Sequence, residues 1–367
     1  MRNFWQRVPA PLRTAIKWTV KLLVTAGVFY LLLSHRLTTA DGERLSIWQA
    51  ITTQLHALTW QELLPFLLIA IVLKFTGIFC SMLRWHLLLC AQGIRFNFWH
   101  IVGSFLIGRF LGTFLPSTLG LDGYKLYDAA RFSDRVIEPA AATVVEKILG
   151  LAGILLTFVL TLPLGYQVLG EAAAKTALIT LPLAVLGIAG LMVLLARASL
   201  AESVARWIST RHVRLAANVQ RIEQAAVAYR GRTGLLSWCL VLSFLVHFTT
   251  SAMYYFTARA VGAASASFFQ VTFASSIQVF ATVMSPFTIA GEGVREVVQA
   301  LLLAKHLGTS QSVLSAALGF WAAEALTLVG AFFWWARRAG YKPRSLVLAD
   351  GAQLSVDRET TARLFRR

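Results

Sequence analysis

The feature that most constrains this chain is a series of long apolar runs, which recur along most of its 367 residues. A run of about 20 such residues forms a helix that can cross the roughly 30 Å hydrocarbon core of a bilayer. Charged residues make up only 14% of the chain, whereas soluble domains usually carry about 25%. The clearest runs lie near residues 15–34, 62–83, 140–164, 176–196, 235–258 and 312–336. We therefore expect an all-α polytopic membrane protein.

Two further apolar segments, 98–115 and 268–285, are each followed by a proline, a polar patch with glycine and a weaker helical stretch. Lys and Arg in short loops mark the cytoplasmic side of a membrane protein. If both segments were single crossings, the arginine-rich loop 197–234 would lie outside. If each enters and returns on one side, every basic loop and both termini are cytoplasmic. This pattern predicts six spanning helices plus two re-entrant helical hairpins, the first entering from the cytoplasm and the second from the outside.

The same topology organises the chain and accounts for its net charge of +17. We expect a basic cytoplasmic N-terminus at 1–14, a single transmembrane domain at 15–336 and a basic cytoplasmic tail at 337–367. A strongly basic chain normally suggests nucleic acid as a partner, but no nucleic-acid-binding module is present. We expect the loop and tail cations to be orientation signals and anchors against anionic lipid headgroups, with membrane lipids rather than nucleic acid as partners.

An internal repeat links the two ambiguous segments. When the chain is aligned with itself, Phe98 pairs with Phe268, and the match tightens after the prolines. The stretch Pro116–Lys125 then lies over Pro286–Arg295 with the shared pattern P-x-T-[LI]-[GA]-x-[DE]-G-x-[KR]. A pattern of this length, present twice, indicates a duplicated element.

The repeat units are residues 62–164 and 235–336, each a span, a hairpin and a second span with an acid inside it, Glu146 or Glu324. Since the predicted hairpins enter from opposite sides, the two units are related by inversion across the membrane. Inverted repeats with broken helices near the midplane are a recurrent transporter design, because the two halves exchange roles to give alternating access.

The two copies of the pattern are candidates for a phosphate site. Irregular backbone at membrane depth is tolerated only inside protein or facing a water-filled cavity, and a glycine-bearing turn that opens a helix presents free amides to an anion. The candidate substrate-binding residues of the pattern are Thr118, Asp122, Gly123 and Lys125 in the first copy and Thr288, Glu292, Gly293 and Arg295 in the second. Pro116 and Pro286 are the helix breaks. Asp122 also fits a simple N-cap, and the prolines fit simple helix ends.

Four ionisable residues lie inside predicted apolar segments, namely Glu146, Glu324, Lys74 and Arg109. Each costs at least about 2.5 kcal/mol at the centre of a membrane helix, so each is a functional candidate. Glu146 lies near the cytoplasmic end of its span beside Lys147, which favours a structural pairing as much as a role with substrate. Lys74 requires an acidic partner from a neighbouring helix.

Catalytic and metal motifs are missing from the sequence. The three cysteines lack C-x-x-C spacing, and the seven histidines include no H-E-x-x-H. No G-x-S-x-G or Walker-type loop occurs either. We therefore expect no metal, no cofactor and no enzymatic reaction.

Several motifs together resemble a known family. They are Arg84-Trp85 with Gly93, Pro116–Lys125, Glu146-Lys147 with Gly150-Leu151, and Pro286–Glu296, of which Gly293-Val294-Arg295-Glu296 is the most specific. From about Arg84 to Glu324, the chain is similar to the flippase-like transmembrane domain of lysylphosphatidylglycerol synthases and its stand-alone relatives. It departs from that pattern at Leu121 and Ala290, where glycine is usual, at Thr288, where serine is common, and at Lys147, where arginine is common.

The resemblance implies movement of a lipid with a charged or phosphate-bearing headgroup between leaflets of a bacterial plasma membrane. Full synthases carry a soluble aminoacyl transferase domain after the membrane part, and only a short polar tail follows Trp335 here, so we do not expect the synthesis reaction. The expected substrate is an anionic or aminoacylated phospholipid or a polyprenyl-phosphate-linked lipid. Two alternatives stay open: a non-catalytic subunit of a separately encoded lipid-linked glycosyltransferase or lipid-modifying synthase, and an enzyme using Asp122 or Glu292 as a base on a lipid phosphate.

Overall fold

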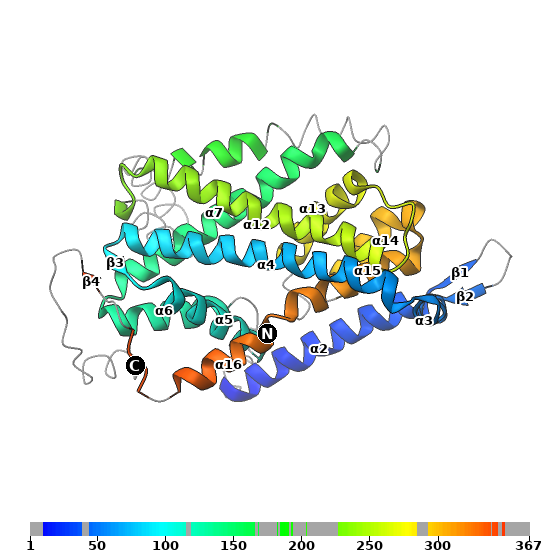
Figure 1. Cartoon of the computed structure of the whole chain (residues 1–367), viewed down its shortest axis with the longest axis horizontal. Helices are drawn as coiled ribbons and strands as arrows, with labels where there is room; N and C mark the ends of the chain where they lie inside the picture. Colours follow the sequence, from blue (N-terminus) through cyan, green and yellow to red (C-terminus); the bar gives the residue numbers. More distant parts are fainter. Residues whose placement is uncertain are drawn as a thin grey trace, which may run out of the picture. The chain divides into compact units, whose positions relative to one another are not determined.

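The described part of the chain is mostly helical (Figure 1). The computed structural model describes residues 10–38, 44–114, 119–165, 168, 182, 184–190, 192–193, 203, 227–284, 293–338, 340–343 and 347–348.

The first half of the described chain consists of α2 (Ala10–Ser34), α3 (Ile47–Ala57), α4 (Trp60–Ala91), α5 (Phe98–Phe114), α6 (Leu119–Ser133), α7 (Ile137–Thr161) and the short 3-10 helix η1 (Leu162–Gly165). The second half consists of α12 (Thr233–Ala260), α13 (Phe268–Met284), α14 (Val294–Leu307), α15 (Thr309–Glu324) and α16 (Thr327–Arg337). Four very short strands pair antiparallel, β1 (Arg36–Thr38) with β2 (Arg44–Ser46) and β3 (Ile94–Arg95) with β4 (Val347–Leu348). The prediction of a helical protein is therefore confirmed for the described residues, and the strands are small additions to it.

Four helical stretches of the described chain are long and apolar enough to cross a membrane: Trp60–Ala91, Ile137–Gly165, Thr233–Ala260 and Thr309–Arg337. They correspond to four of the predicted spans. The first predicted run lies in the 25-residue helix α2, of which the stretch Leu22–Ser34 is apolar. The predicted run 176–196 falls largely outside the described residues.

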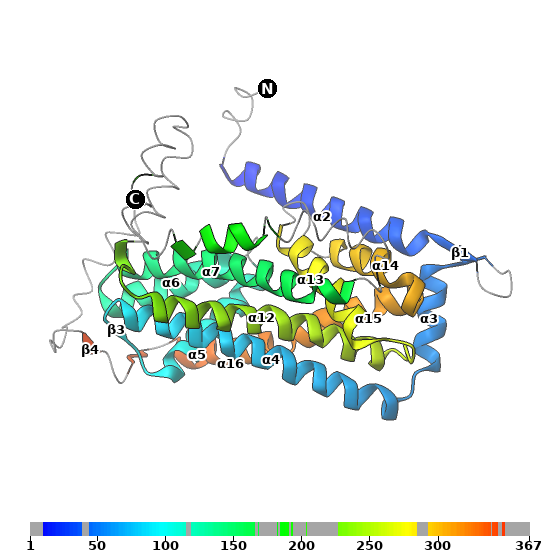
Figure 2. The same ribbon diagram turned by 90° about the horizontal axis from the view of Figure 1, so that it is seen from above.

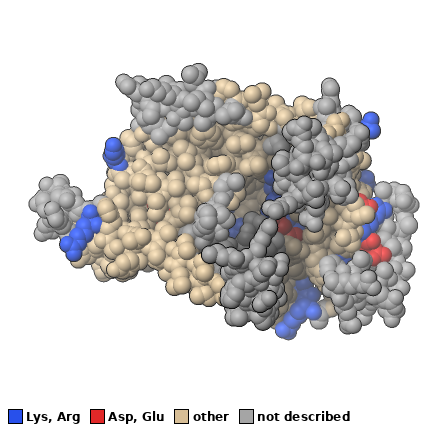
Figure 3. All heavy atoms as spheres, turned by 180° about the vertical axis from the view of Figure 1, so that it is seen from behind, with Lys and Arg blue, Asp and Glu red and all other residues tan. Residues whose placement is uncertain are grey.

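Helix α4 shows the surface that a membrane protein presents to lipid. Leu64, Leu68, Val72 and Phe75 recur every three or four residues along one face of α4 and are all exposed. Large apolar side chains exposed in such a stripe are costly in water but not against acyl chains. On the molecular face shown in Figure 3, few of the described residues are charged.

The segments of the two predicted hairpins contain packed helix pairs. Helix α5 packs on α6, and α13 packs on α14 (Figure 1). The residues between the partners, 115–118 and 285–292, lie outside the described part. Helix α5 also packs along α16, as Figure 2 shows from above.

The chain divides into two compact units. The first contains Met1–Val72, Leu164–Ala173 and Ser251–Ala322, and the second contains Leu73–Pro163, Ala174–Thr250 and Ala323–Arg367. The first unit holds α2, α3, α13 and α14, and the second holds α5, α6, α7 and α16, while α4, α12 and α15 contribute residues to both. The core of the first unit includes Ile47, Ile51, Val261, Ala300, Val313 and Leu314. The core of the second includes Trp85, Leu88, Leu89, Phe105, Val145 and Leu149.

Glycines let helices of the second unit approach closely. A Cβ atom at Gly153 of α7 would lie 2.6 Å from the Cβ atom of Ser243 on α12. A Cβ atom at Gly108 of α5 would lie 2.9 Å from the carbonyl oxygen of Leu121 on α6. Small residues at helix contacts are typical of membrane helices, because close backbone approach increases van der Waals contact.

Substituting Gly153 with alanine is therefore expected to destabilise the protein by about 1–3 kcal/mol, because the added methyl group overpacks the contact with Ser243. Gly187→Ala is the matched control, since nothing lies within 4 Å of a Cβ atom there and alanine is the better helix former. Thermal denaturation of the purified variants tests this. Equal melting temperatures for the two variants would contradict close packing at Gly153.

Candidate functional site

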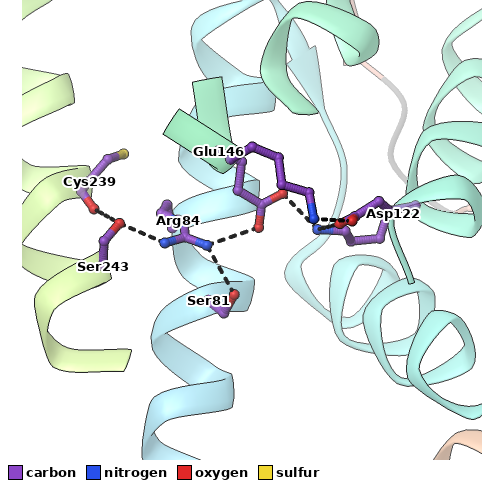
Figure 4. A network of polar contacts seen from close by, with 8 residues as sticks. Ser81, Arg84, Asp122, Glu146, Cys239 and Ser243 are labelled. Atoms are coloured by element: carbon purple, nitrogen blue, oxygen red, sulfur yellow. Dashed lines mark hydrogen bonds and ion pairs between the residues drawn. The ribbon is translucent and has the colours of Figure 1, made fainter. Parts of the chain in front are cut away.

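The second unit contains a buried network of ion pairs between three helices (Figure 4). Lys125 of α6 places its Nζ atom 2.7 Å from Oε2 of Glu146 on α7. Arg84 of α4 places its Nη2 atom 3.3 Å from Oε1 of the same carboxylate. The side chains are only 1%, 6% and 7% exposed for Lys125, Glu146 and Arg84 respectively. One carboxylate therefore bridges two cations away from water.

Aromatic rings surround the Lys125 ammonium. Its Nζ atom lies 4.8 Å from the ring centroid of Trp85 and 5.0 Å from that of Phe105. A cation above an aromatic face is attracted by the ring quadrupole, most strongly where water is excluded. The rings thus help to keep a charged lysine in the interior of an apolar protein.

Hydroxyl groups hold the Arg84 guanidinium between α12 and α7. Its Nη1 donates to Ser243 Oγ at 2.6 Å, and Ser243 in turn donates to the carbonyl of Cys239. Figure 4 shows Arg84 between Ser243 and Glu146. The Nε atom of Arg84 is buried and has no hydrogen-bond partner among the described residues. The guanidinium is therefore fixed in place and keeps one donor for another group.

Asp122 extends the network to the first turn of α6. It forms an ion pair with Lys147 of α7, and its Oδ1 atom lies 3.5 Å from Lys125 Nζ. A carboxylate in the first turn of a helix is also favoured by the helix dipole. Helix α6 begins at Leu119, so Asp122 lies inside it and the prediction of an N-cap is wrong. Gly123, predicted to open the helix, also lies inside α6 and is exposed. Across the network, three cations (Arg84, Lys125, Lys147) face two carboxylates (Asp122, Glu146). Lys147 is half exposed, so the buried cations are Arg84 and Lys125, and both depend on the carboxylate of Glu146.

The second copy of the pattern forms a similar arrangement in the first unit. Arg295 donates from Nε to Oε1 of Glu296 at 2.9 Å, and its guanidinium lies 4.8 Å from the ring centroid of Phe320. The other oxygen of Glu296 accepts the backbone N–H of Gly293 at 2.7 Å. Gly293 has φ of 82°, a conformation that favours glycine. In both copies a buried cation is thus held by a glutamate and an aromatic ring.

Arg109 and Glu324, two of the predicted intramembrane charges, pair with each other. Arg109 Nη2 lies 3.2 Å from Glu324 Oε1 and 3.0 Å from the carbonyl oxygen of Ala323. Glu324 is the last residue of α15 and also accepts a hydrogen bond from Thr327. The predicted run 312–336 lies within the candidate span Thr309–Arg337, and a short turn after Glu324 separates its two helices, α15 and α16. Arg109 of α5 binds a carbonyl at that break.

Lys74, for which the sequence predicted an acidic partner, contacts a hydroxyl group. Its Nζ atom donates to Thr250 Oγ1 at 3.3 Å, and the side chain is half-buried. Of the remaining predicted residues, Pro116, Thr118, Pro286, Thr288 and Glu292 lie outside the described residues.

The sequence prediction of the site omitted Arg84 and Glu296, although both lie in the motifs that carry the family resemblance. It also omitted a buried polar group in the first unit. There the hydroxyls of Thr257 and Ser315 are 2.9 Å apart, and Gln299 Nε2 donates to Ser315 at 3.2 Å. Thr257, Gln299 and Ser315 lie on three different helices, so no spacing in the sequence groups them.

A third polar cluster joins the start of α5 to the end of α16. His100 Nε2 lies 2.8 Å from Asp128 Oδ2, and Arg337 Nη2 donates to the carbonyl of His100 at 2.6 Å. Arg337 Nη1 lies 3.6 Å from the other oxygen of Asp128. The sequence contains no local signal for this cluster, because its members lie far apart in the chain.

Comparison with known proteins gives one match. The family model described as "Lysylphosphatidylglycerol synthase TM region" matches residues 18–337. The match includes Arg84, Lys125, Glu146, Arg295 and Glu296. Searches of curated proteins and of solved structures gave no match.

Proposed function

The chain belongs to the lysylphosphatidylglycerol synthase transmembrane region family, and on this basis we propose that it is a flippase-like transporter of an anionic lipid. The cargo is an anionic or aminoacylated phospholipid, or a polyprenyl-phosphate-linked lipid, moved between the leaflets of a bacterial plasma membrane. The two helix pairs act as re-entrant hairpins of an inverted repeat, with both termini cytoplasmic.

The observation that carries this proposal is the pair of buried cations, Lys125 and Arg84, that share the carboxylate of Glu146. Ionisable groups inside a membrane protein are expensive, so two cations that depend on one shared carboxylate are suited to exchange it for the anionic group of a ligand. Lysine and arginine are the side chains that bind phosphate through charge-assisted hydrogen bonds. A lipid phosphate is an anion that can take the place of the Glu146 carboxylate beside these cations.

Glu146 acts in this mechanism as an internal counter-ion. In the described arrangement Glu146 forms ion pairs with both Lys125 and Arg84. A headgroup phosphate competes with the carboxylate for these cations, and the displaced Glu146 takes up a proton or pairs with a cationic aminoacyl group on the headgroup. The network is thus neutralised by Glu146 when empty and by the lipid when loaded.

Arg295 and Glu296 perform the same exchange in the second repeat. In alternating access, Lys125 binds the phosphate in one state and Arg295 binds it in the other, while Glu324 handles a cationic group or a coupling proton. Because each cation has its own glutamate, neither is left as an uncompensated charge when the lipid moves on.

The test is transport of labelled lipids in proteoliposomes by an Arg295→Met variant. Removing Arg295 leaves the buried Glu296 without its cation, so transport is measured per folded, reconstituted molecule. We expect headgroup movement of anionic lipids to fall by about 10-fold or more, since a charge-assisted contact contributes about 1.5–3 kcal/mol. The control is Lys305→Ala, which removes an exposed cation from the same helix. Equal transport by the two variants would contradict a role for Arg295 and favour the non-transporting subunit as the alternative.

A further inference from the structure

A second cationic site lies in the second unit, formed by residues outside the ion-pair network. It is a pocket of about 450 Å³ whose lining includes Cys90, Gln92, Arg95, Glu138 and Arg232. These residues come from the end of α4, from β3, from the start of α7 and from the segment before α12.

Hydrogen bonds hold the walls of the pocket together. Gln92 Nε2 donates to the carbonyl of Ala228 at 3.0 Å, and the Tyr229 hydroxyl donates to the carbonyl of Leu88 at 2.9 Å. Tyr229 is fully buried, and burial raises the pKa of its phenol, so it remains a donor at neutral pH. Gly93, a residue of the family motif, has φ of 77° and turns the chain from α4 into β3. The pocket is therefore preformed.

The charges on the pocket are unbalanced. Arg95 and Arg232 are both exposed, and neither forms an ion pair within the described residues. The acid of the lining, Glu138, lies 3.7 Å from Arg135 Nη1 and is partly neutralised by it. Two guanidinium groups thus face the pocket with little opposing charge. Arginine is suited to phosphate because its planar group presents paired donors.

The pocket lies where three candidate membrane spans end. Helix α4 ends at Ala91, α7 begins at Ile137 and α12 begins at Thr233, and all three are candidate spans. Three spans that end at one place define the level of the membrane surface. Ile137, beside Glu138 in the chain, is 74% exposed, which provides apolar surface for an acyl chain. Basic pockets between membrane helices on the cytoplasmic side are suited to anionic headgroups.

We propose that this pocket binds the phosphate of an anionic phospholipid at the membrane surface, through Arg95 and Arg232. The proposal requires only that the chain is a membrane protein, so it holds whether or not the protein transports lipid. A free phosphate-bearing solute shares the headgroup chemistry, but it would make no use of the exposed Ile137 or of the position at the ends of three spans.

Cys90 provides a reporter for the test without any substitution. It is one of three cysteines in the chain. It is partly exposed in the pocket, whereas Cys80 and Cys239 are buried. The protein is placed in nanodiscs of phosphatidylcholine, with or without phosphatidylglycerol, and the rate of maleimide labelling is measured. We expect phosphatidylglycerol to slow labelling of Cys90 several-fold, because the bound headgroup covers the thiol.

Arg95→Ala combined with Arg232→Ala is expected to abolish this protection, and each single variant to reduce it. Arg230→Ala is the matched control, because Arg230 is exposed two residues from Arg232 and does not line the pocket. Protection is expressed for each variant as the ratio of the labelling rates without and with phosphatidylglycerol, since removing a nearby cation also changes the reactivity of the Cys90 thiol. Cys90→Ala confirms which cysteine is labelled.

Labelling of Cys90 at the same rate with and without phosphatidylglycerol would overturn the proposal. Protection that persists in the double variant would also overturn it. If the double variant does not fold, protection that persists in both single variants has the same meaning. Protection by inorganic phosphate in phosphatidylcholine nanodiscs, equal to that by phosphatidylglycerol, would overturn the lipid as the ligand. Loss of transport leaves the labelling ratio unchanged, so failure of this proposal and failure of the proposed function are distinguishable.

Discussion

Replacing Glu146 with glutamine is expected to destabilise the folded protein by about 3–5 kcal/mol, the usual consequence of removing one partner from a buried ion pair. Glu146 is the carboxylate that bridges Lys125 and Arg84. Without it, Asp122 would be the one carboxylate left in the network, facing three cations. The glutamine amide retains a hydrogen-bond acceptor but no negative charge, so two buried cations lose their compensation.

Thermal unfolding in detergent or bicelles measures this effect, and the double variant Glu146→Gln with Lys125→Met provides the control. The double variant removes one acid and one cation together, so we expect it to be more stable than Glu146→Gln alone. If the loss of stability in the double variant equals the sum of the losses in the two single variants, Glu146 does not act by balancing the charge of Lys125.

The second large effect is expected from Lys125→Met, on transport rather than on stability. Removing Lys125 leaves two matched pairs, Arg84 with Glu146 and Lys147 with Asp122, so no buried acid loses its last cation. The methionine also fills the space between Trp85 and Phe105 with an apolar chain of similar length. Anionic lipid transport is nevertheless expected to fall by about 10- to 100-fold, because the phosphate loses a charge-assisted contact worth about 1.5–3 kcal/mol.

Arg131→Ala is the control for this variant, because Arg131 is an exposed cation on the same helix, α6. It is expected to transport at the wild-type rate. A folded Lys125→Met protein that transports as well as Arg131→Ala would show that Lys125 stabilises the fold without binding substrate. We expect Lys125→Met to be more stable than Glu146→Gln. The reverse order would contradict the argument from the balance of cations and carboxylates in the network.

The sequence predicted the framework of this protein because membrane spans have a strong local signal. A long uncharged run specifies a helix whatever its neighbours, and α4, α7 and α12 follow their predicted runs closely. The break after Glu324 could not be predicted in the same way. Ala325 and Leu326, the residues of the turn, are good helix formers. Tertiary packing brings Arg109 to Glu324, and the turn itself brings Thr327 to the same residue.

The members of the site were easier to predict than their partners. Lys125, Glu146, Arg109 and Glu324 are each unusual as charges within apolar segments, but their pairing depends on which helices pack together. Arg109 and Glu324 are 215 positions apart in the chain. No local pattern indicates such a contact.

Arg84 and Glu296 were missed for different physical reasons. An arginine near the end of a span is usually an orientation signal, and this one turns inward to Glu146 instead. Adjacent residues of a helix do not normally face each other, yet Glu296 reaches both Arg295 and the Gly293 amide, because all three lie at the first turn of α14. Helix ends free the backbone groups that make such local contacts possible.

The central claim, that the protein moves an anionic headgroup between leaflets, is tested most directly by headgroup accessibility in proteoliposomes that contain the wild-type protein. The account predicts protein-dependent movement of an anionic lipid, in phosphatidylglycerol, aminoacylated or polyprenyl-phosphate form, and no comparable movement of phosphatidylcholine. Folded, reconstituted protein that moves none of these anionic lipids faster than protein-free vesicles do would contradict it.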